Sequence, residues 1–266
     1  MGQLLNIPNA DYSQNGFKPP LEEVYKGLIL EALDEVEFKP TNSTIITLQY
    51  SNDGFTWNNV STSEVTHLAP GQRMAFRAYV RSTSRFQDAT NCTKFNFSKG
   101  HVKASGDMSY YAPAVQGAYM WLFSNKSYAN YGVEDASELV IPVGSTARDC
   151  CSYMFCRTPL KQAPQLPSLQ IPGGVYSYMF SDCRLLPAAP DLPATTFLSG
   201  SNDAYTAMFE KCSTLRSVTI RCTGSRAFTI WLSGVASSGT IYKYDTLTLP
   251  QSSSGIPAGW TTVSLD

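Results

Sequence analysis

The second half of the chain repeats one arrangement of four residues, and this repeat constrains the fold more than any other feature of the sequence. Each copy is built on Tyr, Met, Phe and Cys at positions i, i+3, i+4 and i+7. The complete copies are Tyr176, Met179, Phe180, Cys183 and Tyr205, Met208, Phe209, Cys212, and degenerate copies precede them as Tyr119, Leu122, Phe123, Lys126 and Cys151, Met154, Phe155, Thr158. This spacing predicts that each copy forms the apolar face of a short helix.

An extended segment follows the repeated residues. Residues 163–167 and 189–193 both have the form A-P-x-L-P, and Leu215, Val218 and Ile220 have the spacing of a leucine-rich-repeat strand. The Phe residues of successive copies lie 25 to 32 residues apart. Because one such unit cannot bury its apolar face alone, the repeat predicts a solenoid whose units stack on one another.

The region before the repeats has the pattern of β-strands. Residues 36–38 and 74–80 alternate between apolar and polar side chains, and residues 45–50 are β-branched or aromatic. The Asp53-Gly54 step predicts a hairpin, and Pro70-Gly71 predicts a further turn. Several short strands at this spacing favour a small sandwich or barrel.

These patterns predict a mainly β protein in four parts. Prolines, asparagines and glycine interrupt residues 1–25, which are predicted to be an N-terminal arm that is either disordered or ordered by a partner. A β-sandwich-like domain is expected at 26–116, a short leucine-rich-repeat solenoid of strands and short helices at 117–235, and a C-terminal cap at 236–266.

The repeats resemble those of BspA-like surface proteins, which have the form Y-x-x-M-F-x-x-C-x-x-L followed by A-P-x-L-P. The copies at 176–193 and 205–220 match this form best. The copy at 151–167 departs from it, because Leu160 lies five residues after Phe155 where the motif has six. The resemblance covers roughly residues 27–266, since the stretch Y-S-N-D-G-F-T-W also resembles one often found ahead of such repeats.

The resemblance implies a surface protein in one of two settings. One is the bacterial cell-surface adhesin, which carries an export signal. The other is the virion protein of phages that infect Bacteroides, including crAss-like phages. The start M-G-Q-L-L-N has no recognisable signal peptide, so we expect a virion protein made in the host cytoplasm, either a head or tail fibre or another particle-surface protein. A cell-surface adhesin is the alternative, and a glycan-degrading enzyme is a third, less favoured hypothesis.

The virion setting also implies partners. The arm would attach the chain to other virion proteins, and the repeats would contact a host surface glycan or protein. A homotrimer is expected because fibre proteins are commonly trimeric.

The charge content narrows the classes of partner. Charged residues make up 15% of the chain, where about 25% is usual, and the net charge is −1. This balance argues against a polybasic nucleic-acid or membrane-surface binder. No apolar segment approaches the roughly 20 residues that span a bilayer. The exterior is left to Ser, Thr, Asn and Tyr, which favours a surface made for contacts.

No motif in the sequence points to catalysis. The two histidines, His67 and His101, are interpreted as solvated turn residues, and neither G-x-S-x-G nor C-x-x-C occurs. The seven cysteines are interpreted as buried, reduced thiols. We therefore predict a protein that is not an enzyme, with no catalytic, metal or cofactor residues and with ligand-binding residues still to be identified. A pair of carboxylates for glycoside hydrolysis depends on three-dimensional separation and stays open.

Two further predictions concern the positions of the tryptophans. Trp121 and Trp231 lie in apolar runs of the repeat region and are predicted to pack in the core. Trp57 and Tyr50 flank the Asp53-Gly54 turn and are predicted to form a cross-strand pair.

Overall fold

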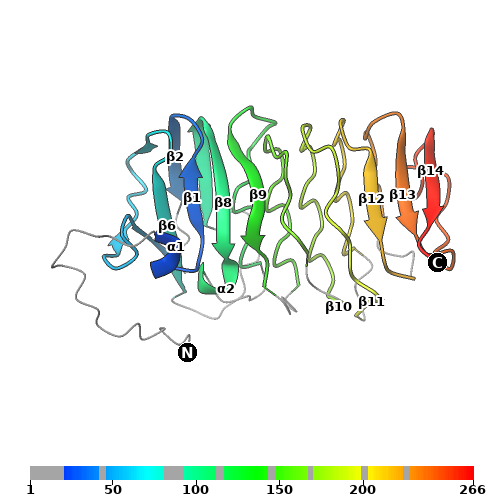
Figure 1. Ribbon diagram of the computed structural model, residues 1–266, viewed down its shortest axis with the longest axis horizontal. Helices are drawn as coiled ribbons and strands as arrows, with labels where there is room; N and C mark the ends of the chain where they lie inside the picture. Colours follow the sequence, from blue (N-terminus) through cyan, green and yellow to red (C-terminus); the bar gives the residue numbers. More distant parts are fainter. Residues whose placement is uncertain are drawn as a thin grey trace.

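The computed structural model describes residues 21–41, 46–80, 93–111, 117–142, 148–166, 170–198, 203–223 and 228–266. It is mainly β, as predicted. Two single-turn helices occur in these segments, α1 (Leu21–Val24) and α2 (Met108–Tyr111). Figure 1 shows an elongated molecule in which the elements from β8 to β14 follow one another along the long axis in sequence order.

Two sheets form the N-terminal half. The larger sheet has six strands in the order β4 (Asn58–Asn59), β3 (Ile46–Ser51), β6 (Arg73–Val80), β1 (Ile29–Ala32), β8 (His101–Asp107) and β9 (Gly132–Val140). The smaller has three, in the order β5 (Thr66–Leu68), β2 (Val36–Thr41) and β7 (Lys94–Lys99). Neighbouring strands are antiparallel except β8 and β9, which are parallel. Parallel pairing thus begins at β9.

Aromatic side chains on alternate positions join the two sheets. Phe38 on β2 lies 5.9 Å from Phe76 on β6 and 5.6 Å from Phe95 on β7, measured between ring centroids. All three rings are fully buried. The alternation at 36–38 reflects one buried face of β2. On β6, Met74 and Phe76 face the same core while Ala75 is buried on the opposite face, and the strand predictions at both places are confirmed.

The predicted hairpin is present, but its aromatic pair is not. Strands β3 and β4 are antiparallel, with Tyr50 opposite Asn58. Trp57 instead packs against Tyr25, at 4.8 Å between ring centroids, and lies 4.1 Å below the guanidinium of Arg77. The cross-strand prediction for Tyr50 and Trp57 was wrong because the connection is longer than a two-residue turn and shifts the pairing by one residue.

Only the end of the predicted N-terminal arm falls among the described residues, and that end packs on the large sheet. Leu21 in α1 is buried in a small cluster with Ile29 and Ala75, and Tyr25 packs against the same cluster. The Tyr25 hydroxyl donates to the Phe76 carbonyl at 2.8 Å. Residues 1–20 of the predicted arm lie outside the described part of the chain.

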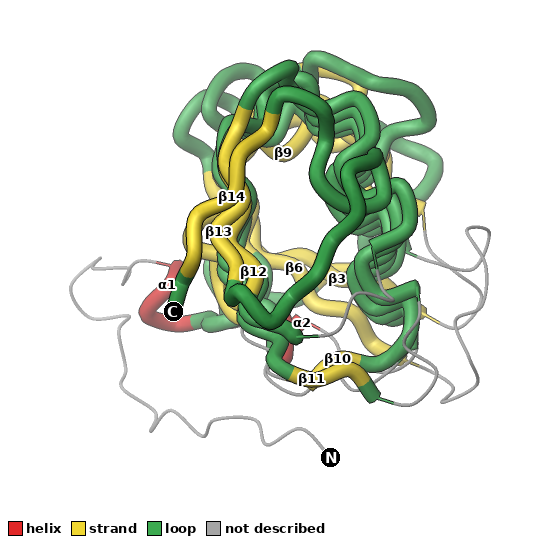
Figure 2. The backbone as a smooth tube through the Cα atoms, turned by 90° about the vertical axis from the view of Figure 1, so that its right-hand side faces the viewer, coloured by secondary structure: helices red, strands yellow, loops and turns green. Residues whose placement is uncertain are grey.

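From residue 117 the chain makes successive passes, here called layers, that stack along the long axis. Figure 2 shows β12, β13 and β14 on one side of this stack and turns on the other. The strands are parallel: β10 (Gln170–Ile171) pairs with β11 (Thr196–Phe197), and β12 (Ser217–Ile220), β13 (Gly239–Lys243) and β14 (Trp260–Ser264) pair in that order. Segment 189–193 bonds to β12 only intermittently, because its prolines have no N–H to donate.

The turn side of the layers is not helical, so the prediction of short helices was wrong. In one layer, alternate N–H groups donate to carbonyls three residues earlier at 3.1 to 3.2 Å, as in Met154 to Cys151 and Cys156 to Tyr153. The N–H groups between them donate to the next layer at 2.8 to 3.1 Å, as in Phe155 to Met179. Linked turns, joined layer to layer, replace the helix.

The apolar spacing misled because these turns repeat every four residues, close to the 3.6 residues of a helix. Apolar pairs that are fully buried, such as Met179-Phe180, alternate with polar pairs that keep a small exposed fraction, such as Ser181-Asp182 at 5% and 8%. Positive φ angles recur at the same interval: Asp149 (φ 57°), Tyr153 (57°) and Arg157 (65°) fall in one layer. A helix admits no such residues, yet both structures place positions i, i+3, i+4 and i+7 on one side.

A column of rings runs through the layers. Phe95, Phe123, Phe155, Phe180, Phe209 and Trp231 follow one another with centroid separations of 5.4 to 6.4 Å. One buried hydrophobic cluster extends from Leu28 to Trp260 and includes this column. The boundaries predicted at 116/117 and 235/236 fall within that cluster, and the division into domains stays a prediction.

Removal of one ring from this column is expected to destabilise the whole stack. Phe180→Ala leaves a cavity between Phe155 and Phe209 and is expected to lower the free energy of unfolding by about 3–5 kcal/mol. Phe55→Ala is the matched control, because Phe55 is 55% exposed, and it is expected to change stability by less than about 0.5 kcal/mol. Denaturant titration followed by circular dichroism measures both, and equal losses would contradict the packing described.

The hairpin turn depends on the ionised form of Asp53. Its Oδ1 accepts from the N–H groups of Phe55 at 2.9 Å and Thr56 at 2.7 Å. Burial alone would raise the pKa of Asp53, but these hydrogen bonds lower it from 3.8 to about 2. The ionised carboxylate therefore stabilises the fold above pH 3.8, and this contribution is lost as the pH falls towards 2.

Asp53→Ala is expected to cost about 1 kcal/mol at neutral pH, a modest value because the carboxylate is partly exposed. The difference from wild type should shrink as the pH falls from 3.8 towards about 2. Urea titrations at several pH values measure it, with the exposed Glu64→Ala as control. A difference that stays constant with pH would show that the charge is irrelevant.

Candidate functional site

The outer face of the turn side carries three stacked aromatic side chains, here called the outer ladder: Trp121, Tyr153 and Tyr178. The rings of Trp121 and Tyr153 lie 3.9 Å apart with an interplanar angle of 9°, and those of Tyr153 and Tyr178 lie 4.5 Å apart at 5°. All three are half-buried. Trp121 was predicted to be in the core, and that prediction was wrong, whereas Trp231 is fully buried as predicted.

The geometry of the layers determines where the rings of the outer ladder lie. Each ring belongs to the residue two positions before a Phe of the inner column, and that position points outward. Its backbone is left-handed, with φ of 62° at Trp121, 57° at Tyr153 and 56° at Tyr178. Such a conformation costs a residue with a side chain roughly 1–2 kcal/mol, and glycine would adopt it without strain. Aromatic stacking of about 0.5–1.5 kcal/mol per pair offsets part of this cost.

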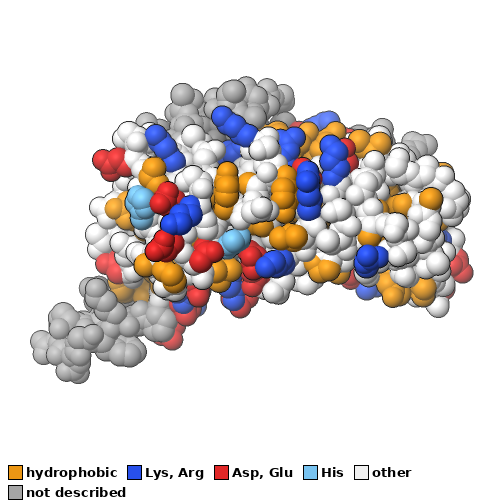
Figure 3. All heavy atoms as spheres, turned by 90° about the horizontal axis from the view of Figure 1, so that it is seen from above, with side chains coloured by type: hydrophobic (Ala, Val, Ile, Leu, Met, Phe, Trp, Pro, Cys, Tyr) orange, Lys and Arg blue, Asp and Glu red, His pale blue; other side chains and the backbone are white. Residues whose placement is uncertain are grey.

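Two cationic side chains lie over aromatic rings, one of which, Trp121, belongs to the ladder. Lys94 Nζ lies 5.8 Å from the Trp121 ring centroid. The Arg184 guanidinium lies 4.4 Å from the ring of Tyr128, and its Nε donates to Asp182 Oδ1 at 2.7 Å. Figure 3 shows hydrophobic side chains beside Lys and Arg near the middle of one face of the molecule, whereas its C-terminal end carries little charge.

The Tyr153 hydroxyl remains protonated at neutral pH. Burial above all, together with the neighbouring Tyr178, raises the pKa of Tyr153 to about 12, while Arg157 opposes the shift. A protonated phenol donates a hydrogen bond. The ladder therefore presents ring edges and hydroxyl donors to the outside, with positive charge beside them.

The two histidines belong to the N-terminal strands. His67 is solvated as interpreted but lies in a strand, and His101 is partly buried at the start of a strand. His67 lies in β5, exposed, with Nδ1 3.7 Å from Glu37. His101 begins β8, where Nδ1 is 2.7 Å from Asp34 Oδ2 and Nε2 is 3.9 Å from Glu134 Oε2. His101 thus belongs to an ion-pair cluster that links the β1–β2 turn to β9. In the described segments, no group of three or more His, Cys, Asp or Glu is arranged to hold a metal ion.

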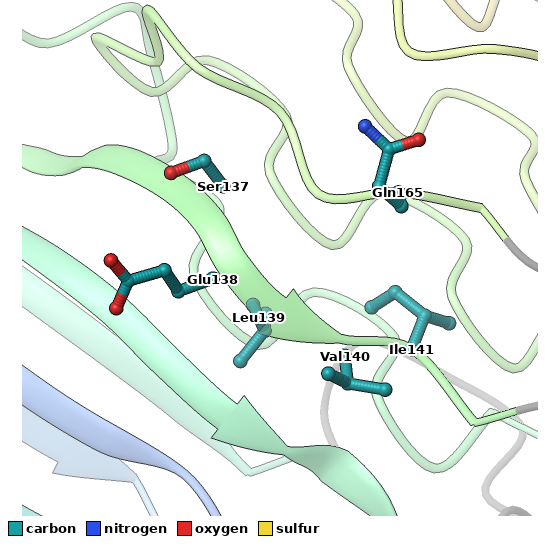
Figure 4. A pocket seen from close by; sticks show the side chains of 6 residues that line it. All are labelled: Ser137, Glu138, Leu139, Val140, Ile141 and Gln165. Carbon is teal, nitrogen blue, oxygen red and sulfur yellow. The ribbon is translucent and has the colours of Figure 1, made fainter.

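A small hollow lies at the end of β9. Its volume is about 150 Å³, and it is lined by Ser137, Glu138, Leu139, Val140, Ile141 and Gln165. Figure 4 shows that the Glu138 carboxylate points away from Gln165, and that carboxylate pairs with Lys103. The lining is mainly apolar and brings no acid–base pair together, so this hollow is a weaker candidate than the outer ladder.

Six cysteines are buried free thiols, as predicted, and Cys92 lies outside the described residues. The repeated cysteine bonds one layer to the previous one. Cys183 Sγ donates to the Phe155 carbonyl at 3.1 Å, and Cys212 Sγ to the Phe180 carbonyl at 3.0 Å. Their role is in packing. Burial raises the pKa of Cys183 to about 12.

Sequence reasoning named no binding residue and so missed the outer ladder. A signal for it exists, since an aromatic residue stands two positions before Phe in three successive copies: Trp121-x-Phe123, Tyr153-x-Phe155 and Tyr178-x-Phe180. Under a helical interpretation, these positions are unrelated surface residues. Only the four-residue turn geometry aligns them in one column.

Comparison with known proteins gives no relative, since no family model, curated protein or solved structure matches the chain. Among the residues that the structure describes, no helix is long and apolar enough to cross a bilayer.

The buried thiols are expected to be unreactive in the folded protein. At pH 8 the pKa of about 11 at Cys156 and about 12 at Cys183 leaves almost no thiolate, and the thiolate is the reactive form. In a Cys92→Ser variant, a thiol reagent such as DTNB should release no chromophore until guanidinium unfolds the chain, after which six thiols react. Rapid reaction of any thiol in the native protein would contradict this arrangement.

Proposed function

We propose that this protein is a non-enzymatic surface protein in which a β-sandwich-like domain is followed by a short leucine-rich-repeat solenoid. Its outer ladder would contact another molecule. The single observation that carries the proposal is the column of Trp121, Tyr153 and Tyr178 on the outer face of the layers. Half-exposed aromatic side chains with a polar edge are suited to recognition, because they add contact area at a low cost in conformational entropy.

The proposed setting is a phage virion, as a head or tail fibre or another particle-surface protein. Two features support it. The repeats resemble BspA-like modules, which also occur in virion proteins, and the layers extend from the N-terminal sheets along the long axis of an elongated molecule. In this proposal, residues 1–25 attach the chain to other virion proteins, and the protein assembles as a homotrimer. A bacterial cell-surface adhesin with the same repeats is the alternative.

Mass spectrometry of purified phage particles tests the virion setting. The chain should be present in the particles, and residues 1–25 should be protected from protease there but cleaved in the free protein. Absence from the particles would reject the proposal. Labelling of the chain on the surface of intact bacteria would then favour the adhesin.

A further inference from the structure

The stacking of the outer ladder leaves few ring faces free. Tyr153 is covered on one side by Trp121 and on the other by Tyr178, and the Lys94 ammonium lies near the Trp121 ring. An aromatic ring carries negative charge on its faces and positive charge at its edge. The ladder therefore presents positive edges and hydroxyl donors outward, an arrangement that attracts acceptor oxygens and repels cations.

The cationic side chains of Arg157 and Lys126 strengthen the preference for ligands with acceptor oxygens. The Arg157 guanidinium donates from Nη1 to the Lys126 carbonyl at 2.7 Å, which places both residues together at the end of the turn side. Arg157 is also close enough to Tyr153 to affect its pKa. Within the described part of the chain, no carboxylate lies in ion-pair range of Arg157 or Lys126, whereas Arg184 is paired with Asp182. Arg157 and Lys126 thus contribute positive charge that no described carboxylate pairs, although the net charge of the whole chain is −1.

The rings of the outer ladder are regularly spaced along the stack of layers. Its rings recur at 3.9 and 4.5 Å because one ring comes from each layer. A single small anion uses one such position, but an extended polymer with acceptor oxygens on each unit contacts several. The chemistry and the length of the surface both favour a polymeric ligand.

We propose that the outer ladder with Arg157 and Lys126 binds an anionic polysaccharide, one that carries carboxylate or sulfate groups. This inference rests on the proposed function and names its ligand class. Neutral sugars that stack on aromatic faces find few free faces here. Single-stranded nucleic acid binds by stacking bases on aromatic faces, so the same covering of the rings disfavours it.

Affinity electrophoresis of the whole chain tests the proposal. Native gels would contain alginate as the carboxylated probe, dextran sulfate as the sulfated probe, or dextran as the neutral one. We expect retardation in alginate or dextran sulfate and none in dextran. The retardation should weaken as salt is added, because the screening length falls from about 8 Å at physiological salt to about 3 Å at 1 M.

Variants locate the binding surface. Arg157→Gln with Lys126→Gln is expected to weaken binding roughly tenfold, because each exposed charge contributes modestly. The matched control is Arg216→Gln with Lys39→Gln. It removes the same charges from exposed positions elsewhere, and Arg216 likewise donates to a carbonyl, that of Ser238. Tyr153→Phe, which keeps the ring and removes the hydroxyl, should weaken binding with little effect on stability.

Three results would overturn the inference: equal retardation in dextran, tighter binding of a single-stranded oligonucleotide than of either anionic polysaccharide, or equal effects of the two double variants. These outcomes are separable from the failure of the proposed function. If the chain is present in particles but does not bind anionic polysaccharide, only the proposed ligand class is refuted. If it binds anionic polysaccharide but is absent from particles, only the virion setting is refuted.

Discussion

The alternating hydrogen bonding of the turn side is the constraint on which the rest of the molecule depends. Each buried peptide group must find a partner, and here alternate N–H groups close a turn within their own layer while the others bond to the next layer. The layers are therefore held in one register without a helix. That register brings equivalent side chains into columns, with Phe155 above Phe180 inside and Tyr153 above Tyr178 outside.

The same register connects the stack to the N-terminal sheets. Phe95 on β7 stacks on Phe123 at 5.7 Å, and its N–H donates to the Leu122 carbonyl at 2.8 Å. Strand β9 joins the large sheet by parallel pairing with β8 and is bonded to the layer at Lys161. The first layer thus packs directly against the N-terminal sheets. The outer ladder begins there too, because Lys94 precedes Phe95 and lies near Trp121.

Much of the fold was predictable because strands and repeats produce regular spacings of apolar residues in the sequence. Strands β2, β3, β6 and β12 coincide with alternating or β-branched segments. The helix prediction failed because periods of 3.6 and 4 residues are indistinguishable over eight positions. The candidate site was not predicted at all, since Trp121, Tyr153 and Tyr178 are 25 to 32 residues apart in sequence and meet only through contacts between layers. Trp121 was misplaced for the same reason, as its apolar neighbours indicate a core.

The parallel order of β12, β13 and β14 has a mechanical consequence. Among the described residues, strand β14 pairs only with β13, while β12 and β13 each have a neighbour on both sides. Stability in a stacked array is close to a sum of nearest-neighbour terms. A pull on the C-terminus while the N-terminal sheets are held would therefore peel the layers one at a time. The molecule would lengthen in small steps as each layer unfolds. The layers that carry the outer ladder would separate only after β12, β13 and β14 had unfolded.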